Sequence, residues 1–198
     1  MGLDVVIVQH ADKVRLPGDH GLTDLGRQQA TARGQSLRAI PFDGIWCSTL
    51  CRSRETAELI ADAMGVPRQR IRADPRIVER INWWGEAGQT RDVFRADWER
   101  STTDRNYQPV LGDSSRTAGD RFAAFLAELH QRLPSGRALV VAHGGVTIDL
   151  VRTWFGDDCV EAMAQGAIAH GVPPCAITRI TLDGDRRSLE FLAADHLT

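Results

Sequence analysis

The sequence predicts an α/β fold of three layers, in which helices cover both faces of a mostly parallel sheet. Two apolar runs, DVVIVQ at residues 4–9 and ALVVA at residues 138–142, have the length and composition of buried parallel strands. Segments with helical spacing of apolar residues alternate with strand-like runs through most of the chain. The 198 residues fit one domain, and we expect a cap-like insertion at about residues 74–112.

The elements of the first half follow from their capping and stop signals. Thr23 is a good N-cap, and Gly65 is a helix stop. Ser48 or Thr49 is expected to cap the second helix. The expected elements are a strand at 4–9, a helix from Thr23 to about residue 39, a strand at 43–47, a helix ending at Gly65 and a strand at 69–73.

The second half repeats this alternation and then closes with two adjacent strands. Phe122, Phe125, Leu126 and Leu129 give one segment an apolar face at helical spacing. The dipeptide Asp183-Gly184 predicts the turn of a β-hairpin. The expected elements are helices at 90–100 and 117–133, a strand at 138–142, a helix at 146–154 and a hairpin of strands 175–182 and 188–193.

Composition excludes several classes of function. Hydrophobic residues make up 42% of the chain, charged residues 25%, and the net charge is −2. This near balance argues against a partner that is a nucleic acid or a membrane surface. The short apolar run after Met1 is neither a signal peptide nor a membrane span, so we expect a cytoplasmic protein. The pair Cys47 and Cys51 has no second pair nearby, and we expect reduced thiols and no metal.

Two of the predicted strands end in a histidine. His10 follows the strand at 4–9, and His143 follows the strand at 138–142. Ligands of open α/β sheets bind at the carboxyl ends of the strands. Gly144 and Gly145 allow backbone N–H groups to approach a ligand, and the helix that begins near Val146 offers the positive end of its dipole. The pattern predicts an anion site.

A third strand end supplies an arginine. Arg52 lies in the first turn of the predicted second helix, where the helix dipole disfavours a cation. Its position is therefore explained by a bound anion. Arg54 is a second candidate for the same role, and a solvated surface position is an equally good explanation for Arg54.

Several short motifs occur in order along the chain. They are QHA at residues 9–11, GLTDLGRQQA at 21–30, STLCR at 48–52, Glu79 within IVER, GDS at 112–114 and AHG at 142–144. Each is weak alone, but the ordered set covers most of residues 4–182. It resembles the histidine phosphatase superfamily, which includes the cofactor-dependent phosphoglycerate mutases and many small phosphatases.

The resemblance implies a phosphoglycerate mutase-like fold and a reaction that passes through a phosphohistidine. His10 would be the nucleophile, and Arg52 and His143 would bind the phosphoryl oxygens. Glu79 would donate a proton to the leaving oxygen. The reaction needs no metal or other cofactor, because arginine and histidine neutralise the phosphoryl charge. The remaining substrate contacts are expected from Gln9, Lys13, Gly144 and Thr23.

The first motif departs from the family pattern, which is Arg-His-Gly. Gln9 keeps hydrogen-bond donors but lacks the charge and the fork of arginine. This loss could slow turnover by roughly ten- to a hundredfold. Lys13 or Arg15 could restore the charge, or the substrate could differ. If no other residue restores this positive charge, Arg52 and a protonated His143 would provide most of the stabilisation of the phosphoryl group.

The sequence is compatible with three functional hypotheses. The first is a phosphatase acting on a small phosphomonoester or a phosphoprotein. The nearest rival is a phosphoglycerate mutase-type phosphotransferase, but the acidic cap, which contains Glu86 and Asp92, is poorly suited to a second phosphate. The third is a weakly active or non-catalytic module that binds a phosphorylated ligand, which Gln9 favours and Glu79 opposes. The natural substrate, the oligomeric state and the role of Trp83 and Trp84 stay open.

Overall fold

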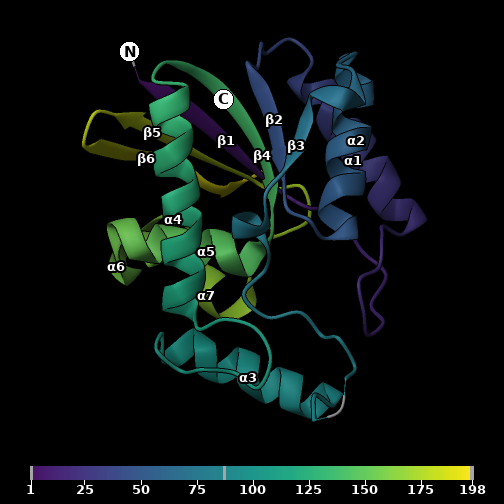
Figure 1. Ribbon diagram of the computed structural model, residues 1–198, viewed down its shortest axis with the longest axis vertical. Helices are drawn as coiled ribbons and strands as arrows, with labels where there is room; N and C mark the ends of the chain where they lie inside the picture. Colours follow the sequence, from purple (N-terminus) through teal and green to yellow (C-terminus); the bar gives the residue numbers. More distant parts are fainter. Residues whose placement is uncertain (1, 87, 197–198) are drawn as a thin grey trace.

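A single six-stranded sheet organises the molecule, and the computed structural model describes residues 2–86 and 88–196. The strand order is β3-β2-β4-β1-β5-β6 (Figure 1). The strands are β1 (Leu3–Gln9), β2 (Gly44–Cys47), β3 (Ile71–Ala73), β4 (Gly136–Ala142), β5 (Ile177–Asp183) and β6 (Arg186–Ala194). Strands β1 to β4 are mutually parallel, and β5 and β6 form an antiparallel hairpin at one edge. The predicted α/β class with a mostly parallel sheet is confirmed.

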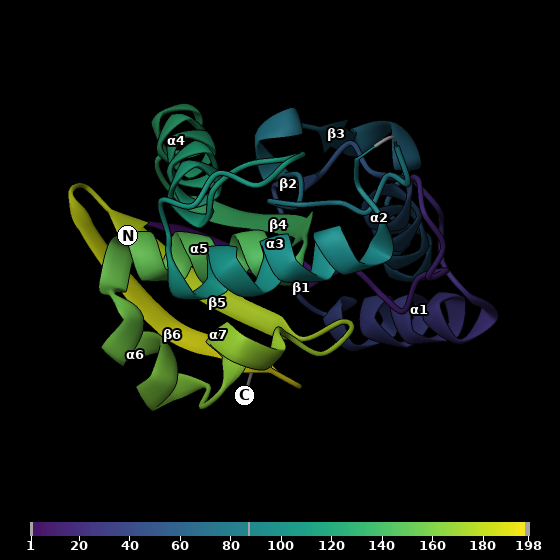
Figure 2. The same ribbon diagram turned by 90° about the horizontal axis from the view of Figure 1, so that it is seen from below.

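Helices cover both faces of the sheet (Figure 2). Helices α1 and α2 pack together on one face, and α4 and α5 pack together on the other. The helices are α1 (Asp24–Leu37), α2 (Cys51–Met64), α3 (Arg91–Thr103), α4 (Ser115–Arg132), α5 (Gly144–Phe155), α6 (Asp157–Met163) and α7 (Ala167–His170), with 3-10 turns at Arg68–Arg70 and Pro75–Ile77. Short α6 and α7 were not predicted. None of the helices in the described ranges is long and apolar enough to cross a membrane.

Strand β1 shows why its sequence is apolar without interruption. Val5 and Ile7 belong to the cluster under α4 and α5, whereas Val6 and Val8 belong to the cluster under α2. All four are at most 1% exposed. Since successive side chains of a strand point to opposite faces, a strand covered on both sides must be apolar at every position.

The start of α2 differs from the prediction that Ser48 or Thr49 caps it. The helix begins at Cys51, and its N-cap, Leu50, has no capping side chain. The carboxylate of Asp19, from another loop, accepts the Cys51 N–H at 2.9 and 3.1 Å. The helix terminus is thus satisfied through tertiary contact. The Ser48 hydroxyl accepts the N–H of Leu50 at 3.2 Å, and its own proton can serve a second partner.

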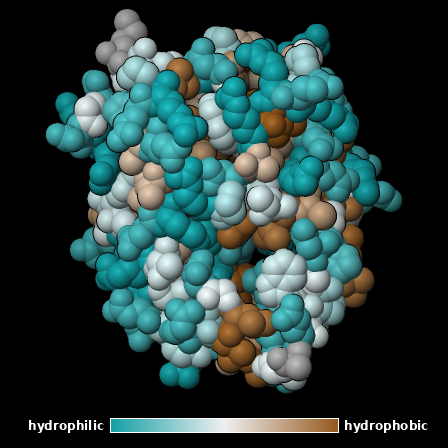
Figure 3. All heavy atoms as spheres, viewed as in Figure 1, coloured by the Kyte–Doolittle hydropathy of each residue, from teal (hydrophilic) through white to brown (hydrophobic). Residues whose placement is uncertain are grey.

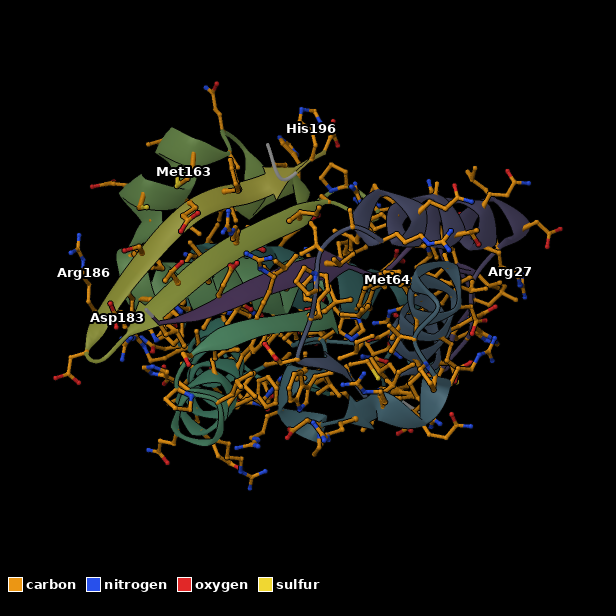
Figure 4. All side chains as sticks on the ribbon, turned by 90° about the horizontal axis from the view of Figure 1, so that it is seen from above. Arg27, Met64, Met163, Asp183, Arg186 and His196 are labelled. Atoms are coloured by element: carbon orange, nitrogen blue, oxygen red, sulfur yellow. The ribbon has the colours of Figure 1, made fainter. Side chains whose placement is uncertain are left out.

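The topology brings the two strand-end histidines to one edge. Strands β1 and β4 are neighbours, and the N–H of His10 donates to the carbonyl of Ala142 at 3.0 Å. Helix α3, from the predicted cap region, lies beyond this carboxyl edge (Figure 1). The turn of the β5–β6 hairpin, marked by Asp183 and Arg186, lies near the start of β1 at the opposite edge (Figure 4). The assignment of residues 74–112 as a cap to a single domain stays a prediction.

Candidate active site

The hydrogen bonds of His10 define its tautomer. Its Nδ1 lies 2.7 Å from the carbonyl oxygen of Ala11, which only accepts, so Nδ1 carries the proton. Its Nε2 accepts a hydrogen bond from Nε of Arg52 at 3.2 Å. The Ala11 N–H donates to the hydroxyl of Thr56, which fixes the turn after β1 against α2. Nε2 therefore presents a lone pair toward Arg52.

The surroundings of His10 keep the ring uncharged. Burial lowers the pKa of His10 to about 3, and the positive charges of Arg52 and Lys13 act in the same direction. The bond to the Ala11 carbonyl opposes them but does not reverse the shift. At neutral pH the ring is a neutral imidazole, which is the form that a nucleophile needs.

Arg52 is a buried cation whose partners are neutral. Its side chain is 3% exposed, and its NH1 donates to Oδ1 of Asn82 at 3.0 Å. The amide nitrogen of Asn82 donates in turn to the carbonyl of Gly18 at 3.1 Å. Arg54, the other candidate, is exposed and lies beside Glu58 in a different hollow. Of the two candidates, Arg52 is therefore the arginine that lies beside His10 and His143, which we call the histidine cluster.

His143 lies directly behind His10 and is fully buried. The ring centroids are 5.1 Å apart, in an edge-to-face arrangement. Nε2 of His143 and the hydroxyl of Ser48 are 2.6 Å apart, whereas Nδ1 has no hydrogen-bond partner within the described ranges. Burial, Arg52 and His10 hold the pKa of His143 well below its ordinary value. The structure thus corrects the expectation of a protonated His143, because the ring is neutral here.

Glu79 occupies the N-terminus of α5. Its carboxylate accepts the N–H groups of Gly145 at 3.0 Å and Val146 at 2.8 Å, and that of Arg80 at 2.8 Å. A Cβ on Gly145 would lie 2.5 Å from Oε1 of Glu79, so only glycine permits this approach. The sequence predicted an anion at this helix terminus, and the anion found there is the carboxylate of Glu79 itself.

The four predicted substrate contacts lie at different distances from the cluster. Oε1 of Gln9 is buried without a hydrogen-bond partner in the described structure and would be 3.5 Å from a Cβ on Gly144. Burial and the charge of Arg52 lower the pKa of Lys13. The charge of Lys13 in turn lowers the pKa of both His10 and His143. Thr23 instead caps α1, and its hydroxyl donates to Asp12 at 2.8 Å. Gln9, Lys13 and Gly144 thus border the histidine cluster, whereas Thr23 has a structural role in capping.

Sequence reasoning missed three residues of the site. Ser48 was expected to cap a helix, although it belongs to a quoted motif. Asn82 and Trp98 lie in the cap region, and no local pattern distinguishes them there. The ring of Trp98 lies 2.7 Å from the position of a Cβ on Gly145, beside Glu79. No three His, Cys, Asp or Glu residues in the described ranges form a group that could hold a metal ion.

Fold and site together define the phosphoglycerate mutase-like class of α/β proteins. The profile of the histidine phosphatase superfamily (branch 1) matches residues 8–195. A 2,3-bisphosphoglycerate-dependent phosphoglycerate mutase from Rhizobium meliloti is 33% identical over 183 residues, which are 88% of this chain and 85% of the relative. The chain therefore belongs to the histidine phosphatase superfamily, whose members share a phosphohistidine mechanism and include phosphatases and mutases.

Two solved structures have the same fold. A mycobacterial glucosyl-3-phosphoglycerate phosphatase superposes with a TM-score of 0.74 at 23% identity, covering 97% of this chain and 99% of that one. Bacillus stearothermophilus YhfR superposes with a TM-score of 0.75 at 22% identity, covering 97% of both chains. At this level of identity the likeness extends to the fold alone.

Proposed function

We propose that the protein is a phosphatase that hydrolyses a phosphomonoester through a phosphohistidine on His10. One observation carries the proposal: the lone pair of a neutral His10 faces Arg52, a buried cation whose two hydrogen-bond partners, His10 and Asn82, are uncharged. A dianionic phosphoryl group would give Arg52 a hydrogen-bonded counter-charge, whereas the carboxylates of Glu79 and Asp19 act on it only without a hydrogen bond.

The first half of the reaction forms the covalent intermediate. The phosphoryl group takes the place of the hydrogen bond between Arg52 and Nε2 of His10. Nε2 then attacks phosphorus, and the bond from phosphorus to the ester oxygen breaks. Arg52 and the Nδ1 side of His143 stabilise the charge on the equatorial oxygens. Ser48 orients His143 through its 2.6 Å contact with Nε2.

Glu79 would act as general acid in the first step and as general base in the second. The first step requires the protonated form of Glu79, which gives its proton to the leaving oxygen. The N–H groups of Arg80, Gly145 and Val146 then stabilise the resulting carboxylate. In the second half, water attacks phosphorus and gives its proton to Glu79. The bond from phosphorus to nitrogen breaks, inorganic phosphate leaves and His10 is restored. No metal takes part in this scheme.

The mutase relatives support a second candidate, transfer of the phosphoryl group from His10 to another alcohol. The two reactions share the intermediate and differ in what accepts the phosphoryl group. We favour water, because the cation beside Glu79, Arg80, is already paired with Asp149 at 2.9 Å and does not serve a second phosphate. The substrates in view are small phosphorylated compounds, and we expect the reaction to take place in the cytoplasm.

Turnover of 4-nitrophenyl phosphate tests the proposal directly. The wild-type protein should release inorganic phosphate, and thorough chelation should leave the rate unchanged. His10→Ala should remove the activity while the circular dichroism spectrum is preserved. His130→Ala is the control, because His130 lies on α4 and belongs to no part of the described site. Activity that survives in folded His10→Ala would refute the mechanism. Conversion of 3-phosphoglycerate to 2-phosphoglycerate would favour the mutase.

A further inference from the structure

Three aromatic side chains form a continuous row in the cap region. The rings of Trp83 and Phe94 are stacked with centroids 6.4 Å apart, and those of Phe94 and Trp98 are 6.2 Å apart. Phe94 and Trp98 are four residues apart on α3, so they lie on the same face of that helix. All three are only partly buried. We call Trp83, Phe94 and Trp98 the aromatic row.

One end of the aromatic row reaches the proton donor. A Cβ on Gly145 would lie 2.5 Å from Oε1 of Glu79 and 2.7 Å from Cη2 of Trp98. The carboxylate and the edge of the indole therefore meet over the same glycine. A leaving oxygen that takes its proton from Glu79 must lie at this point, so the carbon skeleton attached to that oxygen emerges beside Trp98.

The other end of the row adjoins the phosphate-binding arginine. Asn82 binds Arg52, and the carbonyl of the next residue, Trp83, accepts the N–H of Gly18 at 2.8 Å. The backbone at the Trp83 end of the row thus adjoins the Arg52 side of the site, and the ring at the Trp98 end adjoins Glu79. Figure 3 shows a hollow between α3 and the rest of the molecule, with hydrophobic side chains around it.

The charges beside the aromatic row do not suit a second anionic group. Arg80 stacks over the ring of Trp98 at 4.2 Å, but its guanidinium is 2% exposed and is bonded to Asp149 and Thr102. Gln9 is neutral where the family pattern has a cation. The cation–π contact to the row recorded in the described ranges is that of Arg80, whose charge is already paired with Asp149, so a carboxylate or second phosphate on the substrate would meet a mainly aromatic surface.

We propose that the aromatic row binds the alcohol part of the substrate, and that the protein prefers phosphomonoesters of aromatic or other apolar alcohols to phosphorylated acids. This inference rests on the proposed phosphatase function and names its substrate class. Aromatic rings bury a large apolar area and stack on flat ligands. One such contact with the substrate is expected to change kcat/KM by about tenfold.

The test compares benzyl phosphate with 3-phosphoglycerate. Both are esters of primary alcohols, so the comparison is not dominated by the leaving oxygen. We expect a higher kcat/KM for benzyl phosphate in the wild-type protein. Trp98→Ala should lower that value by about tenfold, largely through KM, and the loss with 3-phosphoglycerate should be clearly smaller. Trp98→Phe should retain most of the preference.

Trp154→Ala is the matched control, because Trp154 also packs against a ring and an arginine, Phe155 and Arg187, but at the far end of α5. It should leave the preference unchanged. Two results would overturn the inference: a wild-type preference for 3-phosphoglycerate, or an equal loss with both substrates in Trp98→Ala, which would make Trp98 a support for Glu79.

A binding measurement keeps this inference separate from the proposed function. Benzylphosphonate should bind to the wild-type protein more tightly than methylphosphonate, and Trp98→Ala should reduce that difference. If no phosphate is released from any ester while the difference persists, the phosphatase proposal fails and the aromatic site stands. If phosphate is released but the two phosphonates bind equally, the aromatic site fails alone.

Discussion

Arg52 and Arg80 are both almost completely buried, with exposed fractions of 3% and 2%, yet their surroundings differ. Arg80 donates to Asp149 at 2.9 Å and to the hydroxyl of Thr102 at 2.8 Å. Arg52 donates to His10 and to Asn82, and neither carries a charge. A buried charge whose hydrogen-bond partners are all neutral is costly, and for Arg52 only the unbonded carboxylates of Glu79 and Asp19 offset that cost. We infer from this difference that Arg80 stabilises the fold, whereas Arg52 is placed to bind an anionic substrate.

The largest effect is expected for Arg80→Met, which tests whether Arg80 stabilises the fold. The substitution leaves the buried Asp149 without its cation, so the free energy of unfolding at pH 7 should fall by about 3–5 kcal/mol. The pKa of Asp149 is already raised to about 6 by burial, and loss of Arg80 should raise it further. Because the folded state then holds a proton more tightly than the unfolded state, the deficit should shrink as the pH is lowered from 7 to 5.

Urea titrations at the two pH values measure this effect. Arg95→Met is a suitable control, since Arg95 is an exposed residue of α3 with a salt bridge to Glu99. An unchanged urea midpoint in Arg80→Met would mean that the Arg80–Asp149 pair does not stabilise the fold. Arg80 and Arg52 would then not differ in the way inferred above.

The second prediction is a loss of activity without a loss of stability. Arg52→Gln removes a buried charge that has no hydrogen-bonded counter-charge, so the melting temperature should change little or rise. The kcat should fall by about 10²–10³-fold, because the cation that stabilises the phosphoryl oxygens is lost. Arg54→Gln, two residues along the same helix and exposed, should change neither quantity. A large loss of stability with intact turnover in Arg52→Gln would show that Arg52, too, is structural.

The third prediction concerns Asn82, which keeps the surroundings of Arg52 neutral. Asn82→Asp has the same shape but adds a carboxylate 3.0 Å from NH1 of Arg52. That carboxylate should compete with the substrate, lowering kcat/KM by roughly ten- to a hundredfold and weakening inhibition by inorganic phosphate. Asn82→Ser, which brings no charge, should have the smaller effect. Equal inhibition by phosphate in both variants would argue against a role for charge balance.

Local patterns explain which parts of the molecule the sequence predicts. Continuous apolar runs mark β1 and β4, and they predict that His10 and His143, which follow these strands, lie at one edge of the sheet. The contact of Ser48 with His143 spans 95 residues, and that of Arg52 with Asn82 spans 30. Such contacts depend on how distant loops pack, and residue spacing carries no record of them.

The neutral His143 has the same explanation. A histidine at a strand end is expected to titrate near its ordinary value. Complete burial behind His10, close to the charge of Arg52, lowers the pKa instead. Burial of that degree results from the assembled layers, so residue spacing alone does not predict the neutral state of His143.

The smallest expected change is that of Gln9→Arg. An arginine at this position should raise the rate with a generic phosphomonoester by about tenfold and tighten inhibition by inorganic phosphate, because a guanidinium binds a dianion better than an amide does. Steady-state kinetics of this variant should be compared with those of Lys13→Ala. A lower rate in Gln9→Arg together with a large loss in Lys13→Ala would show that Lys13 has taken over the charge.

The central claim is that His10 carries the phosphoryl group. A radiolabelled phosphomonoester should be mixed with the wild-type protein and quenched in base within milliseconds. We predict label on the protein that is stable in base, is lost in acid and maps to His10, and no label on His10→Asn. Label that is absent from the wild-type protein during turnover, or that persists on folded His10→Asn, would contradict the account.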